Sequence, residues 1–404
     1  MKRIFLVFIL TLFLTPTISF GDDNLLLEDL EPFTYTSQEV ASNEEIIIYS
    51  KNIAVFDRNS KMLLFDKNSK EKIPIASTTK ILTCIIALET LNFGENPIYT
   101  ISQNAASATG STLGLKYNKT ISLQDLLYGL MLRSGNDCAI LLAEIISGDI
   151  DSFSILMNKK AKEVHLTNSN FTSPHGLDND NHYSTAYDLI LLTDYALNNP
   201  TFRKIVSCKE KNIVLNGIPT TIHNTNELLG NFEGIYGVKT GFTFNAGRCL
   251  ISAYKNNDFD LIIAVLGANS KSIRSKDTKT LIKYINTNFK NLDFQNIIND
   301  SFEYFLPKIK NSLILNKTQT FPEFHLEKLS NYSLPININR KQIFKTKTYI
   351  TPVLSYKTPK ESIVGSLLLY NNNSVLLKLN IYLSNSLEKN SLPFYFKNFF
   401  FNIF

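Results

Sequence analysis

The sequence predicts an α/β (α+β) domain, in which helices flank an antiparallel sheet, followed by a small all-β domain. Its 404 residues exceed the usual ~100–200 residues of one domain. Strand-like runs stand before and after a middle region whose apolar residues recur at helical period. Beyond residue 295, short strand-like runs alternate with Asn, Ser, Pro and Lys and show no long helical period.

The elements of the first domain follow from local patterns. Two strand-like runs around the turn residues 57–60 predict a hairpin, and Pro74 precedes the helical run IASTTKILTCIIALETL. A second helical run, LQDLLYGLMLRSGNDCAILLAEII, is interrupted at residues 134–136. GIYGVKTGF, GRCLISAYK and DLIIAVLGA predict strands, and SKDTKTLIKYINTNF predicts a helix. We expect the first domain to span residues 35–290 and the β-rich domain residues 295–390.

Composition and charge narrow the class of protein. A content of 44% hydrophobic and 19% charged residues argues against disorder, collagen and a many-pass membrane protein. Residues 301–404 carry 13 Lys and Arg against 5 Asp and Glu, whereas residues 22–300 carry 26 against 31. The basic part suits an anionic membrane or wall surface, and it equally suits a solvated lysine-rich face. We expect no nucleic-acid partner.

The first residues have the features of a secretory signal peptide. Lys2 and Arg3 precede an apolar run over residues 4–14 and the small-x-small triplet at 19–21. The run is shorter than the ~20 residues that span a bilayer, so we expect cleavage and not a retained anchor. The sequence therefore predicts a signal peptide over residues 1–21 and an exported protein.

The cysteines and histidines do not indicate a metal site. Cys84 and Cys138 fall inside apolar helix-like runs, where a thiol usually behaves as a small buried hydrophobe. Cys208 and Cys249 have no paired spacing, and the sequence contains neither CxxC nor HExxH. We expect no metal and no cofactor.

One serine stands out as a candidate nucleophile. The chain lacks the G-x-S-x-G marker of many Ser-His-Asp hydrolases. S-x-x-K begins at Ser69, Ser77, Ser252 and Ser386, but only Ser77 lies at the start of a strongly apolar helix. Ser77 and Lys80 then share one helical face, and the free N–H groups of the helix start can stabilise an oxyanion.

A lysine base requires a second cation nearby. Burial and a neighbouring positive charge both favour the neutral amine. The K-T-G triplet of Lys239, Thr240 and Gly241 lies on a predicted strand, where Gly241 allows a substrate backbone to approach. Between the two motifs, Ser134 and Asn136 form an S-x-N triplet. Each motif alone also fits a helix cap, a turn or a break between helices.

The three motifs together resemble the signature of the serine penicillin-recognising enzymes. S-x-x-K, S-x-N and K-T-G occur in this order, 57 and then 105 residues apart. SPHGLDNDNHYSTAYD, NTNELL and GVKTGFTFNAGRCLISA are similar to segments of the D-alanyl-D-alanine carboxypeptidases, the low-molecular-mass penicillin-binding proteins. The β-rich C-terminal part resembles the tail module of that family less specifically.

The resemblance implies an activity and its partners. The enzyme would remove the terminal D-alanine from peptidoglycan pentapeptide stems, or from their lipid-linked precursor, at the outer face of a bacterial membrane or in the wall. β-Lactams would be covalent inhibitors. Ser77 would be acylated and Lys80 would be its base, Ser134 would relay a proton to the leaving D-alanine, and Asn136 would hold the substrate amide.

The resemblance also implies residues that bind the substrate's carboxylate and oxyanion. Lys239 would supply positive potential and hold Ser134, and Thr240, beside Gly241, would bind the terminal carboxylate. Arg274 would be a further carboxylate-binding residue, unless it is a surface helix arginine. The N–H groups of Ser77 and Phe242 would form the oxyanion hole. We interpret His175 and His182 as structural residues, not as bases.

Three alternatives to the carboxypeptidase interpretation remain open. A β-lactamase shares the three motifs and needs a deacylating carboxylate, and Glu163 superficially suits this role. A transpeptidase has a similar site. A non-catalytic wall-binding protein would be expected to have lost one of the motifs, and all three are intact.

The last residues form an aromatic tail. Seven of the residues 391–404 are aromatic, and Lys397 is their one charged neighbour. The segment is too short to span a bilayer, but as a helix it would lie in the lipid interface next to the substrate. The alternative is that its aromatic side chains pack on the β-rich domain.

Overall fold

The computed structural model describes residues 35–36 and 46–390, apart from 319, 330–331, 340–341, 352 and 373. The expected signal peptide and the aromatic tail lie outside the described residues. Two compact units are present: a larger unit of Val40–Leu292 with Ser333–Arg340, and a β-rich unit of Met1–Glu39, Asp293–Tyr332 and Lys341–Phe404.

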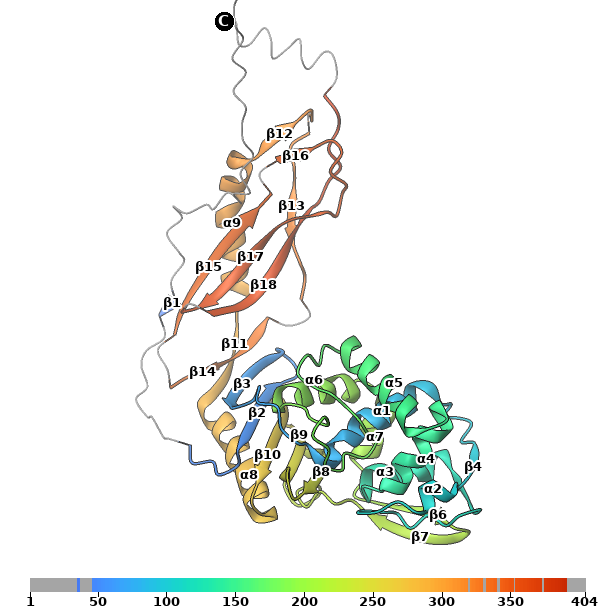
Figure 1. The fold of residues 1–404 in the computed structure, drawn as a ribbon. Helices are drawn as coiled ribbons and strands as arrows, with labels where there is room; N and C mark the ends of the chain where they lie inside the picture. The colour runs from blue at the N-terminus through green and yellow to red at the C-terminus, as the bar shows by residue number, and fades with distance from the viewer. Residues whose placement is uncertain are drawn as a thin grey trace, which may run out of the picture. The chain divides into compact units, whose positions relative to one another are not determined.

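The larger unit is built on a five-stranded antiparallel sheet in the order β3-β2-β10-β9-β8 (Figure 1). The bounds are Asn52–Asp57 for β2, Met62–Lys67 for β3, Ile235–Thr243 for β8, Gly247–Lys255 for β9 and Asp260–Ala268 for β10. The central strand β10 is buried along its whole length, as its continuous apolar run requires when both faces are covered. β8 is an edge strand, and it carries the K-T-G triplet.

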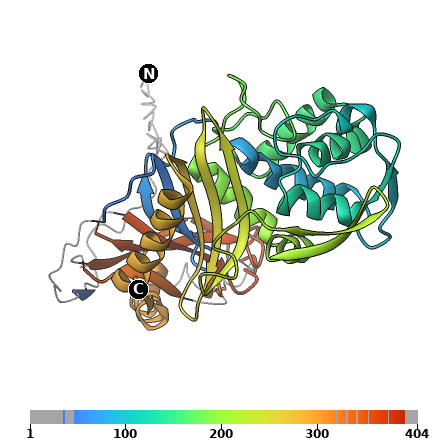
Figure 2. The ribbon, with the colours of Figure 1, turned by 90° about the horizontal axis from the view of Figure 1, so that it is seen from below.

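Helices cover both faces of this sheet, as predicted (Figure 2). Alternate residues of each strand point to opposite faces. Phe56 and Ile262 therefore pack in the core that contains α1 (Lys80–Thr90) and α6 (Ala186–Leu197), whereas Val55 and Ile263 pack against α8 (Lys271–Asn288).

The remaining helices of the larger unit surround α1. They are η1 (Ala76–Thr79), α2 (Gln103–Ala106), α3 (Leu123–Leu132), α4 (Asn136–Ser147), α5 (Ile150–Glu163) and α7 (Pro200–Val206), and two hairpins accompany them, β4 (Ile98–Thr100) with β5 (Thr120–Ser122) and β6 (Glu210–Leu215) with β7 (Ile218–His223). The predicted interruption at 134–136 is confirmed: Ser134 has φ 62° between α3 and α4. A left-handed residue cannot continue a right-handed helix.

The β-rich unit contains a helix that the sequence analysis missed. Its main sheet has the order β1-β15-β17-β18-β13, with bounds Tyr35–Thr36, Ile343–Ile350, Ile363–Asn371, Ser374–Leu383 and Phe324–Leu326. The 18-residue helix α9 (Gln295–Ser312) packs in the core of this unit, so the expectation of an all-β domain without a long helix is wrong. Ile298, Phe302, Phe305 and Ile309 are buried at helical spacing, but Pro307 inside the helix obscured the pattern.

Shorter pairs complete the description: β12 (Ile314–Asn316) runs parallel to β16 (Val353–Ser355), and β11 (Phe289–Asp293) pairs with β14 (Ser333–Asn337). Membrane crossing would need a longer or more apolar helix than any in the described part of the chain.

Candidate active site

The candidate nucleophile Ser77 lies in η1, the 3-10 turn that runs directly into α1. Strand β8 packs closely on this turn, and Gly241 makes the approach possible. A Cβ added to Gly241 would lie 3.1 Å from both the Cβ of Ala76 and the backbone nitrogen of Ser77. The sequence analysis explained Gly241 by the approach of substrate, whereas the structure gives it a contact with η1. This contact sets the K-T-G strand beside the nucleophile.

The loop after α5 holds η1 from another side. Gly176 has φ 82°, and a Cβ there would lie 2.1 Å from the carbonyl oxygen of Ala76. His182 accepts a hydrogen bond from the backbone N–H of Thr172 at Nδ1, so its proton is on Nε2 and is donated to Thr79 Oγ1 at 2.8 Å. Thr79 in turn donates to Ala76 O at 2.8 Å. The backbone of η1 is therefore fixed by the loop after α5.

Lys80 is fully buried, and three acceptors surround its amine. Its Nζ lies 2.9 Å from Ser77 Oγ, 2.7 Å from Asn136 Oδ1 and 2.8 Å from His175 O. Burial, and then the positive charge of Lys239, lower the pKa of Lys80 well below the usual lysine value. A neutral amine has two N–H groups and one lone pair. Asn136 Oδ1 and His175 O can only accept, so in the neutral form of Lys80 the lone pair would face the Ser77 hydroxyl.

Asn136 and Asp137, at the start of α4, are both buried. Asn136 Nδ2 donates to Thr109 O at 2.6 Å, which orients its oxygen toward Lys80. The Asp137 carboxylate accepts four backbone N–H groups, from Leu113, Gly114, Leu115 and Cys138, at 2.8–3.0 Å. Asp137 therefore ties the 113–115 loop to the start of α4. The sequence analysis missed it, although it directly follows the S-x-N triplet.

The second lysine, Lys239, is fully buried on β8 and donates to Thr240 O at 2.9 Å. Burial, and then the charge of Arg274, lower the pKa of Lys239 to about 7. Ser134, which precedes α4, is buried at 6% exposure. The hydrogen bond expected from Lys239 to Ser134 is not among those of the described residues. In this part of the chain the Lys239 amine donates to Thr240 O instead.

Thr240 and Phe242 stand on either side of Gly241. The Thr240 hydroxyl lies 2.7 Å from the hydroxyl of Thr225, a residue of the NTNELL segment. Phe242 is 42% exposed, and the guanidinium of Arg248 lies over its ring at 3.6 Å. The site therefore opens to solvent along the edge of β8.

Arg274 is not a surface helix arginine, because only 2% of it is exposed. Its Nη1 donates to Cys249 O at 3.1 Å, and its Nη2 contacts both carboxylate oxygens of Glu227 at 2.7 and 2.6 Å. Glu227 belongs to NTNELL, whose family likeness was noted without a role for this residue. The only signal in the sequence was its place in that segment.

The two histidines and Glu163, the carboxylate of the β-lactamase alternative, lie in surroundings that differ from those of Lys80. Burial, together with the charge of Lys80, lowers the pKa of His175 to about 3 and that of His182 to about 4, so both are neutral at pH 7. Glu163, at the end of α5, pairs with Lys160 at 2.8 Å and is 46% exposed. Its carboxylate is thus engaged on the surface.

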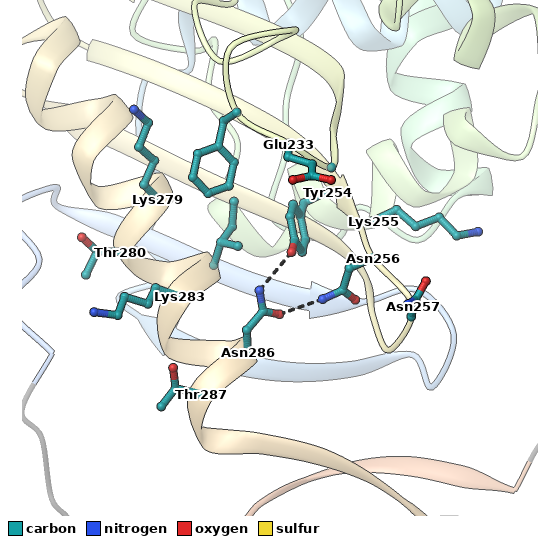
Figure 3. A pocket seen from close by; sticks show the side chains of 13 residues that line it. Glu233, Tyr254, Lys255, Asn256, Asn257, Lys279, Thr280, Lys283, Asn286 and Thr287 are labelled. Carbon is teal, nitrogen blue, oxygen red and sulfur yellow. Dashed lines mark hydrogen bonds between the residues drawn. The ribbon is translucent and has the colours of Figure 1, made fainter.

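A hollow of about 1070 Å³ lies between α8 and the ends of β8 and β9 (Figure 3). Asn256 donates to Asn286 and Asn286 donates to the hydroxyl of Tyr254, while Glu233 and Lys279 stand at its border. None of the residues predicted for catalysis or substrate binding lines it.

Comparisons with known proteins agree with the motif assignment. The profile of a family described as D-alanyl-D-alanine carboxypeptidase matches residues 37–270. The D-alanyl-D-alanine carboxypeptidase DacF of Bacillus subtilis (strain 168) is 31% identical over 264 residues, 64% of this chain and 68% of that protein. The DacC enzyme of the same description from Escherichia coli (strain K12) is 34% identical over 241 residues, 57% of this chain and 59% of that protein. The chain thus spans about three fifths to two thirds of these relatives.

Solved structures share the fold. The Streptomyces K15 DD-transpeptidase matches with a TM-score of 0.56 and 30% identity, over 59% of this chain and 97% of that one. The D-alanyl-D-alanine carboxypeptidase DacD from Francisella tularensis matches with a TM-score of 0.59 over 87% of this chain and 98% of that one; its 22% identity supports the fold alone. The predicted fold class, an antiparallel sheet flanked by helices with a β-rich C-terminal region, is confirmed.

Proposed function

Because the chain belongs to the family of serine-type D-alanyl-D-alanine carboxypeptidases, we propose that it releases the terminal D-alanine of peptidoglycan pentapeptide stems, or of their lipid-linked precursor, through an acyl-enzyme on Ser77. One observation supports Ser77 as the nucleophile and Lys80 as its base: the buried amine of Lys80 lies 2.9 Å from Ser77 Oγ. A neutral amine at hydrogen-bond distance is the geometry of a general base.

Acylation then proceeds by one proton transfer and one bond exchange. Lys80 accepts the hydroxyl proton while Ser77 Oγ bonds to the carbonyl carbon between the two D-alanines. The N–H groups of Ser77 and Phe242 bind the oxyanion. As the C–N bond breaks, Ser134 relays the proton from Lys80 to the amine of the leaving D-alanine.

Substrate binding uses the edge of β8 and the cations behind it. Asn136 accepts from Lys80 and donates one N–H to Thr109 O, and its second amide N–H would donate to the substrate backbone. Lys239 supplies positive potential, Thr240 donates to the terminal carboxylate, and Arg274 adds charge from α8. Water finally hydrolyses the acyl-enzyme, and Ser77 regains its proton. No step needs a metal or cofactor.

The activity is tested with the purified mature chain, incubated separately with a pentapeptide stem and with a penicillin. The expected results are free D-alanine and one covalent penicillin adduct, which peptide mapping places on Ser77. An adduct on Ser69 or Ser386, or release of D-alanine without any adduct, would overturn the site assignment.

Transpeptidation is a second candidate, favoured by the 30% identity to a protein titled a DD-transpeptidase. The two reactions share acylation and differ in whether water or an amine attacks the acyl-enzyme. Addition of glycine as an acceptor to the same assay separates them. A peptide product that carries glycine indicates transfer, and the tetrapeptide acid alone indicates hydrolysis.

We further propose that residues 1–21 are a cleaved signal peptide, that the enzyme acts outside the cytoplasmic membrane, and that residues 391–404 contact the membrane surface. The aromatic side chains would bind the lipid interface, and the basic 301–404 region would add attraction to anionic lipid. Sedimentation with anionic liposomes, with and without residues 391–404, tests the contact. Equal partitioning of two folded forms would contradict it.

The domain bounds are likewise proposed as 35–290 for the catalytic domain and 295–390 for the β-rich domain. Limited proteolysis of the full chain is expected to leave a fragment of about residues 35–290 that retains penicillin binding. A first cut inside residues 35–290 would argue for other bounds.

A further inference from the structure

The guanidinium of Arg274 already forms an ion pair with the carboxylate of Glu227. Glu227 contacts Nη2 through both oxygens, and Ser275 Oγ donates to Glu227 Oε1 at 2.5 Å. The side chain of Arg274 is 3% exposed and that of Glu227 is 35% exposed. Burial opposes ionisation of Glu227, but the hydrogen bonds from Arg274 and Ser275, and then the charge of Arg274, lower its pKa overall. The pair therefore persists at neutral pH, with its acidic member reachable from solvent.

This ion pair lies at the level of the K-T-G triplet. Arg274 Nη1 bonds to the carbonyl of Cys249, and Cys249 is the register partner of Gly241 on the neighbouring strand. On the other side of the pair, Glu227 is two residues from Thr225, whose hydroxyl contacts that of Thr240. The NTNELL segment therefore links the Thr240 hydroxyl to the guanidinium of Arg274.

The substrate brings a carboxylate to the same region. Its terminal D-alanine ends in a free carboxylate, which has the same charge and the same two acceptor oxygens as the side chain of Glu227. Two carboxylates cannot both take the same guanidinium face without mutual repulsion. The ion pair with Glu227 thus weakens the attraction of Arg274 for the carboxylate of the substrate.

We propose that Glu227 is a specificity-determining residue that competes with the terminal carboxylate of the substrate for Arg274. The inference rests on the proposed acylation of Ser77 and concerns how strongly this site selects a free C-terminal carboxylate. With Glu227 in place, recognition of that carboxylate depends mainly on Lys239 and Thr240. The chain therefore distinguishes a free acid from a C-terminal amide less sharply than it would with an unpaired Arg274.

The test compares kcat/KM for a pentapeptide that ends in D-Ala-D-Ala with kcat/KM for its C-terminal amide. Glu227→Gln keeps the size of the side chain and removes its charge. Glu233→Gln is the matched control, since Glu233 is an exposed acid between the NTNELL segment and β8 and has no ion pair among those of the described residues. Assays at pH 6 keep Lys239 charged, because its pKa is about 7 and a lysine is protonated below its pKa.

In Glu227→Gln, kcat/KM for the free acid divided by kcat/KM for the amide should rise about fivefold to tenfold. The rise should come from a higher kcat/KM for the free acid. Glu233→Gln should leave the ratio unchanged, and Glu227→Asp, which keeps the charge, should stay near wild type. Arg274→Gln combined with Glu227→Gln should abolish the gain.

An unchanged ratio of the two kcat/KM values in folded Glu227→Gln would overturn the proposal. An equal loss of kcat/KM on both substrates, restored in Glu227→Asp, would also overturn it, because it would indicate a purely structural role. Failure of the proposed function is a separate outcome: wild type would release D-alanine from neither substrate and bind no penicillin.

Discussion

Lys80 and Lys239 are both fully buried in the larger unit, and they differ in what surrounds their amines. Lys80 has three acceptors, one of which is the Ser77 hydroxyl, whereas the described residues offer Lys239 the carbonyl of Thr240. The difference shows that burial lowers the pKa of both lysines, whereas only the amine of Lys80 lies at hydrogen-bond distance from the Ser77 hydroxyl.

The two lysines also belong to one series of charges. Lys239 lowers the pKa of Lys80, Arg274 lowers the pKa of Lys239, and Glu227 pairs with Arg274. The low pKa of Lys80 thus results first from burial and then from the charge of Lys239, whose own pKa responds to Arg274. Substitutions along this series separate the role of the base from that of the binding cation.

Removal of the nucleophile is expected to have the largest effect. Ser77→Ala should reduce D-alanine release by at least about 10⁴-fold, since Lys80 would have no hydroxyl to deprotonate. Penicillin labelling, followed by intact-mass spectrometry, checks it. Ser386→Ala, at an exposed S-x-x-K serine, is the matched control and should label normally. Labelling of the Ser77→Ala protein would show that another residue is acylated.

Lys80→Arg tests the base directly. A guanidinium keeps the charge but does not lose its proton in proteins, so turnover should fall by about 10³-fold. Lys72→Arg, at the exposed lysine of the Ser69 motif, should retain activity. If Lys80→Arg turned over near the wild-type rate, the base would have to be sought at Lys239.

The proposed role of Lys239 in substrate binding predicts a pH effect. Its ammonium is present below a pKa of about 7 and is lost as the pH rises through that value. KM for a substrate with a free carboxylate should therefore rise by about tenfold between pH 6 and pH 8, while KM for the C-terminal amide changes little. The same rise for both substrates would argue that Lys239 does not attract the carboxylate.

The smallest effect on turnover is expected from Asp137, which stabilises the site without touching the reacting atoms. An asparagine cannot accept all four N–H bonds with one oxygen, so Asp137→Asn should lower the free energy of unfolding by about 2–4 kcal/mol. Urea denaturation measures this change. Asp151→Asn, at an exposed position in the first turn of α5, should change it by less than about 1 kcal/mol.

Much of this account was available from local sequence patterns. The hairpin at 57–60, the break at 134–136 and the strand carrying Lys239 are set by turn residues and by side-chain period, which act over a few residues. The pairing of Ser77 with Lys80 follows from their spacing of three residues. These features need no knowledge of distant contacts.

The features that escaped prediction depend on contacts between distant segments. Glu227 meets Arg274 across 47 residues, and Asp137 ties down a loop more than 20 residues earlier. Gly241 lies tightly against η1, a contact that becomes visible only when β8 and η1 are brought together. Helix α9 was missed for a local reason, because Pro307 hid an otherwise regular apolar spacing.

The central claim is that Lys80 is neutral at working pH and takes the proton of Ser77. The most direct measurement is the pH dependence of the rate of penicillin acylation, in wild type and in Lys239→Gln. Since only the neutral amine is a base, the account predicts an acid limb with a pKa well below the value of about 10.4 for a solvated lysine. It also predicts that this limb moves to higher pH in Lys239→Gln, where the neighbouring cation is absent. An acylation rate that climbs steadily to pH 10 in wild type, or an acid limb that stays in place in Lys239→Gln, would contradict it.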